Sequence, residues 1–231
     1  MVTVGAGPLL QLSDVSRSFG PVHALKPVGL CVDAGRCLAL LGVNGSGKST
    51  LLRIAGGRDT PSTGQVRYRG APLREDDLAA RTEIAMVGDA SSAYPDLTVR
   101  EHLMLVAVAH GAGADAERLV GEAMAECRLS GHEMALPIAL SSGQRQAMQI
   151  AAVLVRPRRL LILDEPEQRL DPGARHWLAG LLTREKARGV AILLATHHVE
   201  LAEAVGDEAV VLLDGEVLAR GTPRDALGSL R

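Results

Sequence analysis

The chain has 231 residues, which is enough for one large domain with a well-buried core. Hydrophobic residues make up 47% of it and aromatic residues only 2%, so that core must be packed mainly with aliphatic side chains. The 25 basic residues nearly balance the 27 acidic ones. This balance argues against a disordered acidic chain and against a protein that binds nucleic acid by neutralising phosphates over a wide surface.

The sequence shows neither a secretion signal nor an apolar run long enough to cross a membrane. The first residues lack the basic start and long apolar run of a secretion signal, and the apolar run 103–109 is far shorter than the ~20 residues that cross a bilayer. Cys31, Cys37 and Cys127 form no CxxC pair and no spacing typical of a zinc site. We therefore expect a soluble cytoplasmic protein with buried free thiols.

Two kinds of strand are predicted along the chain. Segments 9–19, 22–35 and 63–73 alternate in polarity and carry Gly and Pro breaks, as antiparallel strands do. Continuous apolar runs predict strands that are buried on both faces, at 37–43, 159–165, 190–196 and 208–215. Because helical patterns separate these runs, we expect an α/β protein with a mainly parallel sheet.

A glycine-rich loop follows the first buried strand. Its sequence GVNGSGKST at 42–50 fits the pattern G-x-x-x-x-G-K-[ST]. The glycines let backbone N–H groups curl around a phosphate, Lys48 is expected to reach the β- and γ-phosphates, and the Ser49 hydroxyl is expected to ligate Mg²⁺. A chance match in a turn is the alternative, but the strand before and the helix after are the context that the motif requires. The predicted nucleotide ligands are Gly42, Asn44, Gly45, Ser46, Gly47, Lys48, Ser49 and Thr50.

The middle of the chain, 97–156, contains no strand-like run. Thr98 followed by Glu101 forms a capping-box pattern that predicts the start of a helix. Segment 115–129 repeats apolar residues at helical spacing, and a further helical pattern is stopped by Pro157. A helical insert is therefore expected to interrupt the α/β core.

The strand predicted at 159–165 ends in two adjacent acidic residues. Asp164 is placed to hold Mg²⁺ opposite Ser49, and Glu165 to polarise an attacking water molecule. The alternative is that both carboxylates only cap the turn at Pro166. Together with the phosphate-binding loop upstream, the pair indicates a nucleoside triphosphatase.

The stretch LSSGQRQ at 140–146 contains no obvious nucleophile, general base or metal ligand. Followed by a helix and then by the acidic strand, it resembles the LSGGQ signature of ABC-type ATPases. The resemblance covers nearly the whole chain in the right order. Phe19 matches the aromatic residue that stacks on adenine, Asp171 matches the end of the D-loop, and His197 matches the switch histidine.

The resemblance implies a P-loop NTPase of the RecA-like type, with a mainly parallel core sheet, an N-terminal antiparallel β subdomain and an inserted α-helical subdomain. The chain would form one ABC ATPase domain, 1–231. Its core lobe would comprise about 1–88 and 157–231, and its helical subdomain about 90–156.

The resemblance also assigns a role to the signature stretch. A helix that starts there offers N–H groups and serine hydroxyls to an anion. In the family this site contacts the γ-phosphate bound by a second ABC ATPase subunit, so that two subunits enclose two ATP molecules. The expected contacts in trans are Ser141, Ser142, Gly143 and Gln144, with Ser142 in place of the usual glycine. Whether the pair is a homodimer or a heterodimer is left open.

One position departs from the family pattern. A glutamine usually ends the strand before the helical subdomain, where it touches Mg²⁺ or the attacking water, and Asp89 stands there in this chain. Aspartate can still ligate a hard cation. It is shorter, however, and it adds negative charge beside the phosphates. Slower hydrolysis or looser coupling is the hypothesis, and normal function of the site is the alternative.

The expected function is that of an ATP-binding, ATP-hydrolysing subunit of an ABC transporter, with ATP and Mg²⁺ as cofactors. It would work at the cytoplasmic face of the cell membrane beneath integral-membrane permease subunits that are separate polypeptides. Segment 94–103 resembles that of export-type members, which favours export. The alternatives are a non-transport ABC ATPase acting on DNA or the ribosome, and a regulatory nucleotide-binding subunit with low turnover.

Overall fold

The computed structural model describes residues 7–74, 76–88 and 93–228. Its N-terminal part contains a four-stranded antiparallel sheet in the order β2-β1-β4-β5. The strands are β1 (Leu10–Phe19), β2 (Val22–Val32), β4 (Thr63–Tyr68) and β5 (Ala71–Pro72). The predicted antiparallel segments are therefore confirmed, although the run predicted at 63–73 divides into β4 and β5.

The second sheet has six strands in the order β10-β9-β3-β8-β7-β6. Its members are β3 (Cys37–Leu41), β6 (Ile84–Val87), β7 (Leu160–Asp164), β8 (Ala191–Thr196), β9 (Glu208–Leu213) and β10 (Glu216–Gly221). All neighbouring pairs are parallel except β9 and β10. The expected mainly parallel sheet is confirmed. Its parallel strands bring their carboxyl ends to one edge, which is where ligands bind in open α/β sheets.

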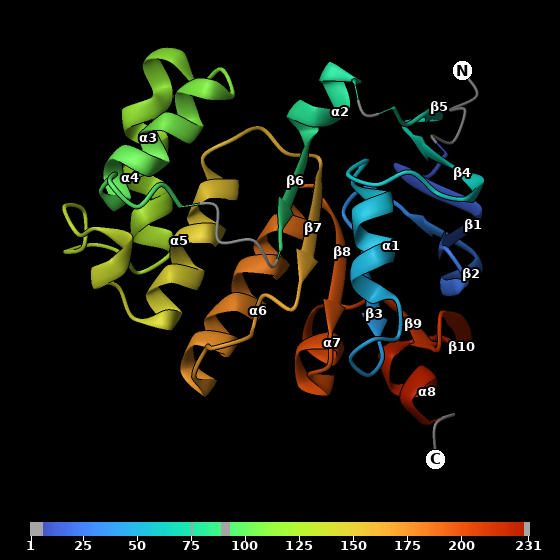
Figure 1. Cartoon of the computed structure of the whole chain (residues 1–231). Coiled ribbons are helices and arrows are strands. Elements are labelled where there is room, and N and C mark those ends of the chain that lie inside the picture. Colours follow the sequence, from blue (N-terminus) through green and yellow to red (C-terminus); the bar gives the residue numbers. More distant parts are fainter. Residues whose placement is uncertain (1–6, 75, 89–92, 229–231) are drawn as a thin grey trace, which may run out of the picture.

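Helices connect the strands and cover the sheets. They are α1 (Lys48–Ala55), α2 (Leu78–Glu83), α3 (Val99–Ala109), α4 (Ala116–Glu126), α5 (Ser142–Leu154), α6 (Pro172–Ala187), α7 (Val199–Val205) and α8 (Pro223–Gly228), with short 3₁₀ turns at Gly113–Asp115 and Pro137–Ala139. In Figure 1, α1 lies between the two sheets, and α3, α4 and α5 gather beyond the β6 edge of the larger sheet. This helical insert lies between β6 and β7 in the chain, as predicted.

Local sequence signals determine where the insert's helices begin. Thr98 caps α3, and its hydroxyl accepts a hydrogen bond from the Glu101 N–H at 3.3 Å while the Glu101 carboxylate accepts one from the Thr98 N–H at 2.8 Å. This is the predicted capping box. The helix α5 ends at Leu154, three residues before Pro157, because the residue that precedes a proline is disfavoured in helical geometry.

Aliphatic side chains fill the core, as the composition predicts. One cluster of buried Leu, Val, Ile, Ala and Met residues extends from α3, α4 and α5 across β6, β7 and β8 to α6. A second cluster lies between the four-stranded sheet, α1 and the other face of the larger sheet. Because the first cluster joins the insert to the core without a break, the two-lobe boundaries given above stay a prediction.

The prediction of three buried thiols is wrong for Cys31, which is exposed, whereas Cys37 and Cys127 are buried. Cys31 lies on β2, where buried residues alternate with exposed ones from Val28 to Val32. Successive side chains of a strand point to opposite faces, so Cys31 points to the solvent side. Within the described ranges, no helix is both long and apolar enough to span a bilayer.

Candidate active site

The glycine-rich loop that joins β3 to α1 depends on two glycines for its conformation. Gly42 has φ of 152°, and a Cβ atom there would lie 2.3 Å from the backbone oxygen of Leu212. Gly47 has φ of 101°, and a Cβ atom there would lie 2.8 Å from the backbone oxygen of Ala24. Both positions require glycine for conformation and for space. The pattern identified in the sequence is therefore a built loop rather than a chance match.

Lys48, the first residue of α1, holds this loop in its curled form. Its side chain is only 4% exposed, and the ammonium group donates hydrogen bonds to the backbone oxygens of Gly42 at 2.8 Å and Val43 at 3.0 Å. The Nζ atom lies 3.7 Å from the Oε1 atom of Glu165. Because the same side chain lines the cavity described below, it lies within reach of a phosphate that enters there.

Glu165 occupies a strained position directly after β7. Its φ is 46°, which is unusual for a residue with a side chain, and its N–H donates to the Ala195 oxygen of β8 at 2.9 Å. Its Oε2 atom lies 3.3 Å from Nδ1 of His197 and accepts a hydrogen bond from the Gln168 side chain. The pairing of β7 with β8 therefore brings Glu165 and His197 together from segments thirty-two residues apart.

Lys48 and Glu165 border a cavity of about 320 Å³, whose lining does not include His197. Its lining contains most of the predicted ligands, namely Asn44, Gly45, Gly47, Lys48, Ser49, Thr50, Asp164 and Glu165. It also contains Ala24 and Gln168, which the sequence analysis missed. Gln168 stands three residues after Glu165, and that spacing in a turn could have indicated it. Ala24 gives no local signal, because only the position of β2 beside the loop brings it there.

The donor set suits a hydrated Mg²⁺–phosphate pair. The Ser49 hydroxyl and the Asp164 carboxylate line the same cavity as Lys48, and hydroxyl and carboxylate oxygens are the hard ligands that Mg²⁺ prefers. Within the loop, the buried Ser46 Oγ atom has no hydrogen-bond partner among the described residues. Such an orphaned donor beside a curled row of N–H groups is consistent with a bound phosphate oxygen.

The signature residues lie elsewhere. Ser141 caps α5, accepting from the Gln144 N–H at 3.2 Å, while the Gln144 side chain accepts from the Ser141 N–H at 2.8 Å. Residues 141–144 are absent from the lining of the cavity that Lys48 and Glu165 border. Ser142 and Gly143 stand in the first turn of α5, where N–H groups have no acceptor within the helix and can bind an anion.

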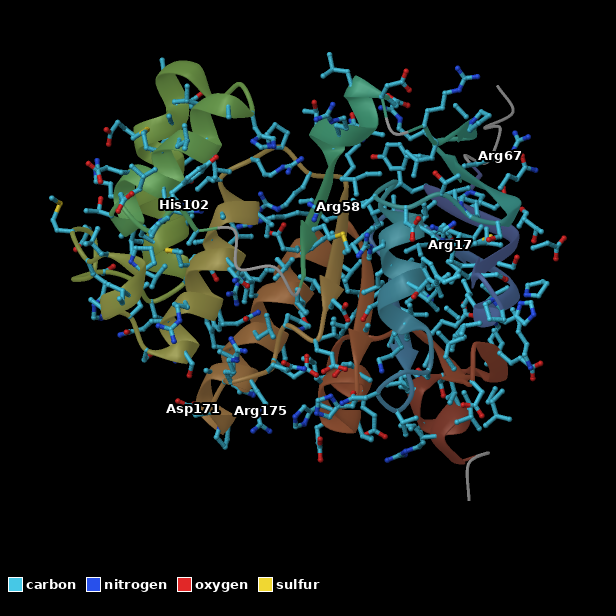
Figure 2. The ribbon with its side chains drawn as sticks, in the orientation of Figure 1. Arg17, Arg58, Arg67, His102, Asp171 and Arg175 are labelled. Carbon is cyan, nitrogen blue, oxygen red and sulfur yellow. The ribbon has the colours of Figure 1, made fainter. Side chains whose placement is uncertain are left out.

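The signature helix begins beside the predicted D-loop. A Cβ atom at Gly143 would lie 3.4 Å from the backbone oxygen of Arg169. Asp171, two residues farther on, caps α6 by accepting a hydrogen bond from the Ala174 N–H at 2.8 Å. Asp171 therefore has a local structural role, and Figure 2 shows it at the end of α6, away from the two sheets.

Of the predicted residues, Gly42, Ser46, His197 and Phe19 are described but do not line the cavity. Phe19 ends β1, is 50% exposed and carries the Arg17 guanidinium 4.6 Å from the centre of its ring. It does not line the cavity, and its stacking on adenine stays a prediction. Asp89, predicted as a metal ligand and catalytic residue, lies outside the described residues.

Comparison with known proteins assigns the chain to a family. The profile of the family described as ABC transporter matches residues 25–168, which is more than half of the chain. The chain belongs to the ABC transporter family. It is the ATP-binding ATPase subunit of such a transporter.

Relatives and solved structures agree with this assignment. The chain is 33% identical over 222 residues to the Nod factor export ATP-binding protein I of Rhizobium etli, covering 96% of this chain and 70% of that protein. A structure titled as the ATP binding subunit of an ABC transporter superposes with a TM-score of 0.86 at 35% identity, covering 96% of this chain and 93% of that one. A dimeric post-hydrolysis structure of the ATP-binding cassette MJ0796, bound to ADP and Pi, gives 0.85 at 27% identity, covering 93% and 99%.

Proposed function

We propose that this chain binds Mg²⁺–ATP in a dimer with a second ABC ATPase subunit and hydrolyses it to drive export through membrane-spanning partner subunits. The observation that carries the proposal is that Lys48 and Glu165 line one cavity, with Nζ of Lys48 3.7 Å from Oε1 of Glu165, and that Nδ1 of His197 lies 3.3 Å from Oε2 of Glu165. The export direction is supported by the relative named for Nod factor export. The dimer is supported by the dimeric cassette bound to ADP and Pi.

In this proposal each side chain has one task. The N–H groups of the loop and Lys48 hold the β- and γ-phosphates, and Ser49 and Asp164 hold Mg²⁺, which supplies charge neutralisation at the phosphates when bound. Glu165 accepts the proton of the attacking water. His197 and Gln168 fix the Glu165 carboxylate, and Phe19 stacks on the adenine. Residues 141–144 of the second subunit complete the contacts to the γ-phosphate.

The decisive experiment is the Glu165→Gln variant. Glutamine keeps the size of the side chain but cannot accept the proton, so we expect ATP affinity to be retained and hydrolysis to fall about 100- to 10,000-fold. An ATP-bound dimer should accumulate and be visible by size-exclusion chromatography. Glu216→Gln, an exposed carboxylate on β10 that pairs with Lys26, is the matched control and should leave turnover unchanged.

The same measurement separates the competing interpretation, a regulatory subunit with little turnover. Asp89 in place of the usual glutamine is the observation that favours it. In that case wild-type turnover, measured alone and with the membrane partner, would already be as low as that of Glu165→Gln. If wild type hydrolyses ATP much faster than Glu165→Gln does, the role of Glu165 as general base is supported. If both proteins hydrolyse ATP at the same high rate, that role is refuted.

A further inference from the structure

A second cavity, of about 490 Å³, lies at the opposite end of α1 from the nucleotide cavity. Lys48, the first residue of α1, lines the first cavity, whereas Gly57 and Arg58, just beyond its last turn, line the second. Figure 2 labels Arg58 in the region between α1 and α2. Further lining comes from the loop before α2, from α2, from β6 and from the residues that follow α3 and α5. Segments that are distant in sequence therefore build one concave site.

The lining of this cavity carries only positive charge. Four arginines and one histidine border it, Arg58, Arg74, Arg81, Arg156 and His110, and no aspartate or glutamate is among the described residues of the lining. In the described part of the chain none of the four arginines forms an ion pair; Glu75, which follows Arg74, lies outside that part. By contrast, Arg69 and Arg159 both form ion pairs with Glu83, the last residue of α2. The positive charge of the cavity is thus uncompensated within the described residues.

Arg156 is held rigidly at the wall of this cavity. Its Nη2 atom donates to the backbone oxygens of Arg81 at 2.5 Å, Thr82 at 3.1 Å and Ile84 at 3.2 Å. Its Nε atom is buried and has no hydrogen-bond partner among the described residues. Burial and the nearby charge of Arg58 lower the pKa of Arg156 to about 10. The Arg156 guanidinium is fixed in position, has an unused N–H donor and is repelled by the positive charge of Arg58. An anion in the cavity would relieve that repulsion and could accept hydrogen bonds.

The arginines of this cavity are not needed to cap the C-terminal end of α1. Gly57, with φ of 68°, donates its N–H to the Ile54 oxygen at 3.0 Å, and the Arg58 N–H donates to the Arg53 oxygen at 2.8 Å. Backbone groups thus close the helix end in the manner of a Schellman motif. Among the described residues, the Arg58 side chain makes no hydrogen bond to these carbonyls, and it lines the cavity.

We propose that this cavity binds a phosphate monoester group, carried by a soluble phosphate ester or by the headgroup of phosphatidic acid. Guanidinium groups match phosphate oxygens in bidentate geometry. A phosphate monoester brings about 1.5 to 2 negative charges and three acceptor oxygens, whereas a single carboxylate brings one charge and would leave most of the arginines uncompensated. The ligand therefore balances the cluster better than an acidic side chain of a protein does.

The test compares wild type with the double variant Arg58→Gln/Arg74→Gln, which removes two exposed charges and leaves the hydrogen bonds of Arg156 intact. Thermal melting is followed with inorganic phosphate against chloride at equal ionic strength, with saturating ADP in every sample so that the glycine-rich loop is occupied. We expect phosphate to raise the melting temperature of wild type and to bind at least tenfold more weakly to the double variant. Arg224→Gln, which lines neither cavity, is the control and should respond as wild type does.

A vesicle arm identifies the source of the phosphate. Co-sedimentation of wild type, but not of the double variant, with vesicles that contain phosphatidic acid assigns the phosphate to the lipid headgroup, and pure phosphatidylcholine vesicles are the control that should bind neither. A response to inorganic phosphate without vesicle binding assigns a soluble ester. Arg58→Glu gives an independent readout, because it supplies an internal carboxylate: it should raise the melting temperature without phosphate and abolish the phosphate response. If wild type, the double variant and Arg58→Glu respond alike to phosphate and to both vesicles, the proposal is overturned.

Discussion

At the scale of single residues, two carboxylates two positions apart differ completely in environment. Glu165 borders the nucleotide cavity, whereas Glu167 is 1% exposed and forms a hydrogen bond with the Thr196 hydroxyl. That hydroxyl also accepts the N–H of His198 at 2.9 Å. Glu167 therefore anchors the turn that carries His197. Its Oε2 atom has no partner among the described residues, and burial raises its pKa despite the hydrogen bond from Thr196.

Glu167→Gln should reveal this raised pKa as a pH-dependent stability difference. A carboxyl whose pKa is higher in the folded state than in the unfolded state stabilises the fold below its ordinary pKa, and that contribution is lost as the pH rises through the folded pKa. Glutamine does not ionise, so the variant should gain stability relative to wild type as the pH rises across that window. Chemical denaturation at several pH values measures the difference. Glu200→Gln, an exposed control, should give a flat difference, and a flat difference for Glu167→Gln would contradict the argument.

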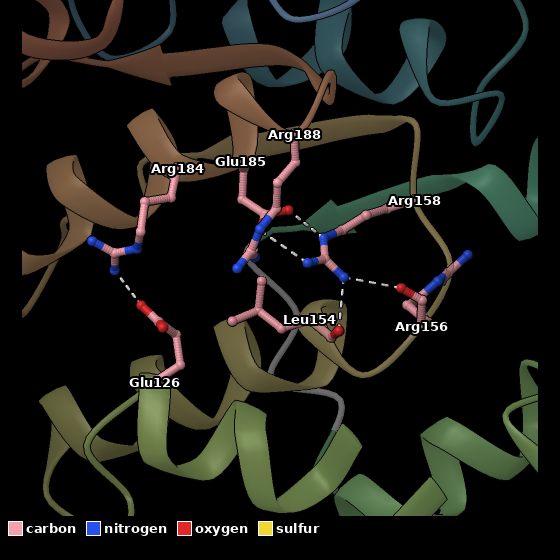
Figure 3. A network of polar contacts seen from close by, with 7 residues as sticks. All are labelled: Glu126, Leu154, Arg156, Arg158, Arg184, Glu185 and Arg188. Carbon is pink, nitrogen blue, oxygen red and sulfur yellow. Dashed lines mark hydrogen bonds and ion pairs between the residues drawn. The ribbon is translucent and has the colours of Figure 1, made fainter. Parts of the chain in front are cut away.

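At the scale of elements, a buried ion pair joins the helical insert to the core. Arg158 donates to the Glu185 carboxylate at 2.5 and 3.0 Å, and Arg188 donates to it at 2.7 Å (Figure 3). Arg158 also donates to the Leu154 oxygen at the end of α5 at 2.7 Å. Burial alone would raise the pKa of Glu185, but the two arginines outweigh it and lower the pKa. The network thus ties α5 to α6 through a fully buried carboxylate.

Glu185→Ala should destabilise the protein by about 3 to 5 kcal/mol, because it leaves the Arg158 charge buried without a partner. The free energy of unfolding from urea titration measures the loss. Glu122→Ala removes an exposed partner of Arg118 and should change stability by about 0.5 kcal/mol or less. A loss at Glu185 no larger than that at Glu122 would show that the buried pair contributes little.

At the scale of the whole molecule, the groups of the proposed catalytic centre are divided between two surfaces. The nucleotide cavity lies between the start of α1 and the end of β7, and the first turn of α5 with Ser142 and Gly143 is not part of its lining. A single copy therefore presents a phosphate-binding loop on one surface and free helix N–H groups on another. Two copies related by a twofold axis can place each surface against the other.

Mixing two inactive variants tests this division. Lys48→Ala impairs a subunit's own loop, and Gly143→Asp places negative charge at the first turn of α5, so each homodimer should be inactive. In a dimer of one of each, one site combines an intact loop with an intact signature. Random pairing should then restore roughly a quarter of wild-type ATP hydrolysis. Co-expression with two affinity tags isolates the mixed dimer; no recovery in it would mean that both elements act within one subunit.

Local sequence signals were sufficient for the elements and for the groups that lie close together in the chain. The capping box of α3, the stop of α5 before Pro157 and the loop at 42–50 all follow from interactions within a few residues. The apolar runs likewise determined the parallel sheet, because only strands buried on both faces lack alternation. The alternation of buried and exposed positions on β2 also indicates that Cys31 is exposed, which the number and spacing of the cysteines do not indicate.

Contacts between distant segments were decided only by the tertiary structure. Ala24 reaches the nucleotide cavity because β2 lies beside the loop, and Glu165 meets His197 because β7 pairs with β8. The arginine-lined cavity at the far end of α1 and the Arg158–Glu185 pair carry no motif in sequence. Such sites depend on which elements pack together, and packing is set by the sum of many weak contacts over the whole chain rather than by any short stretch of it.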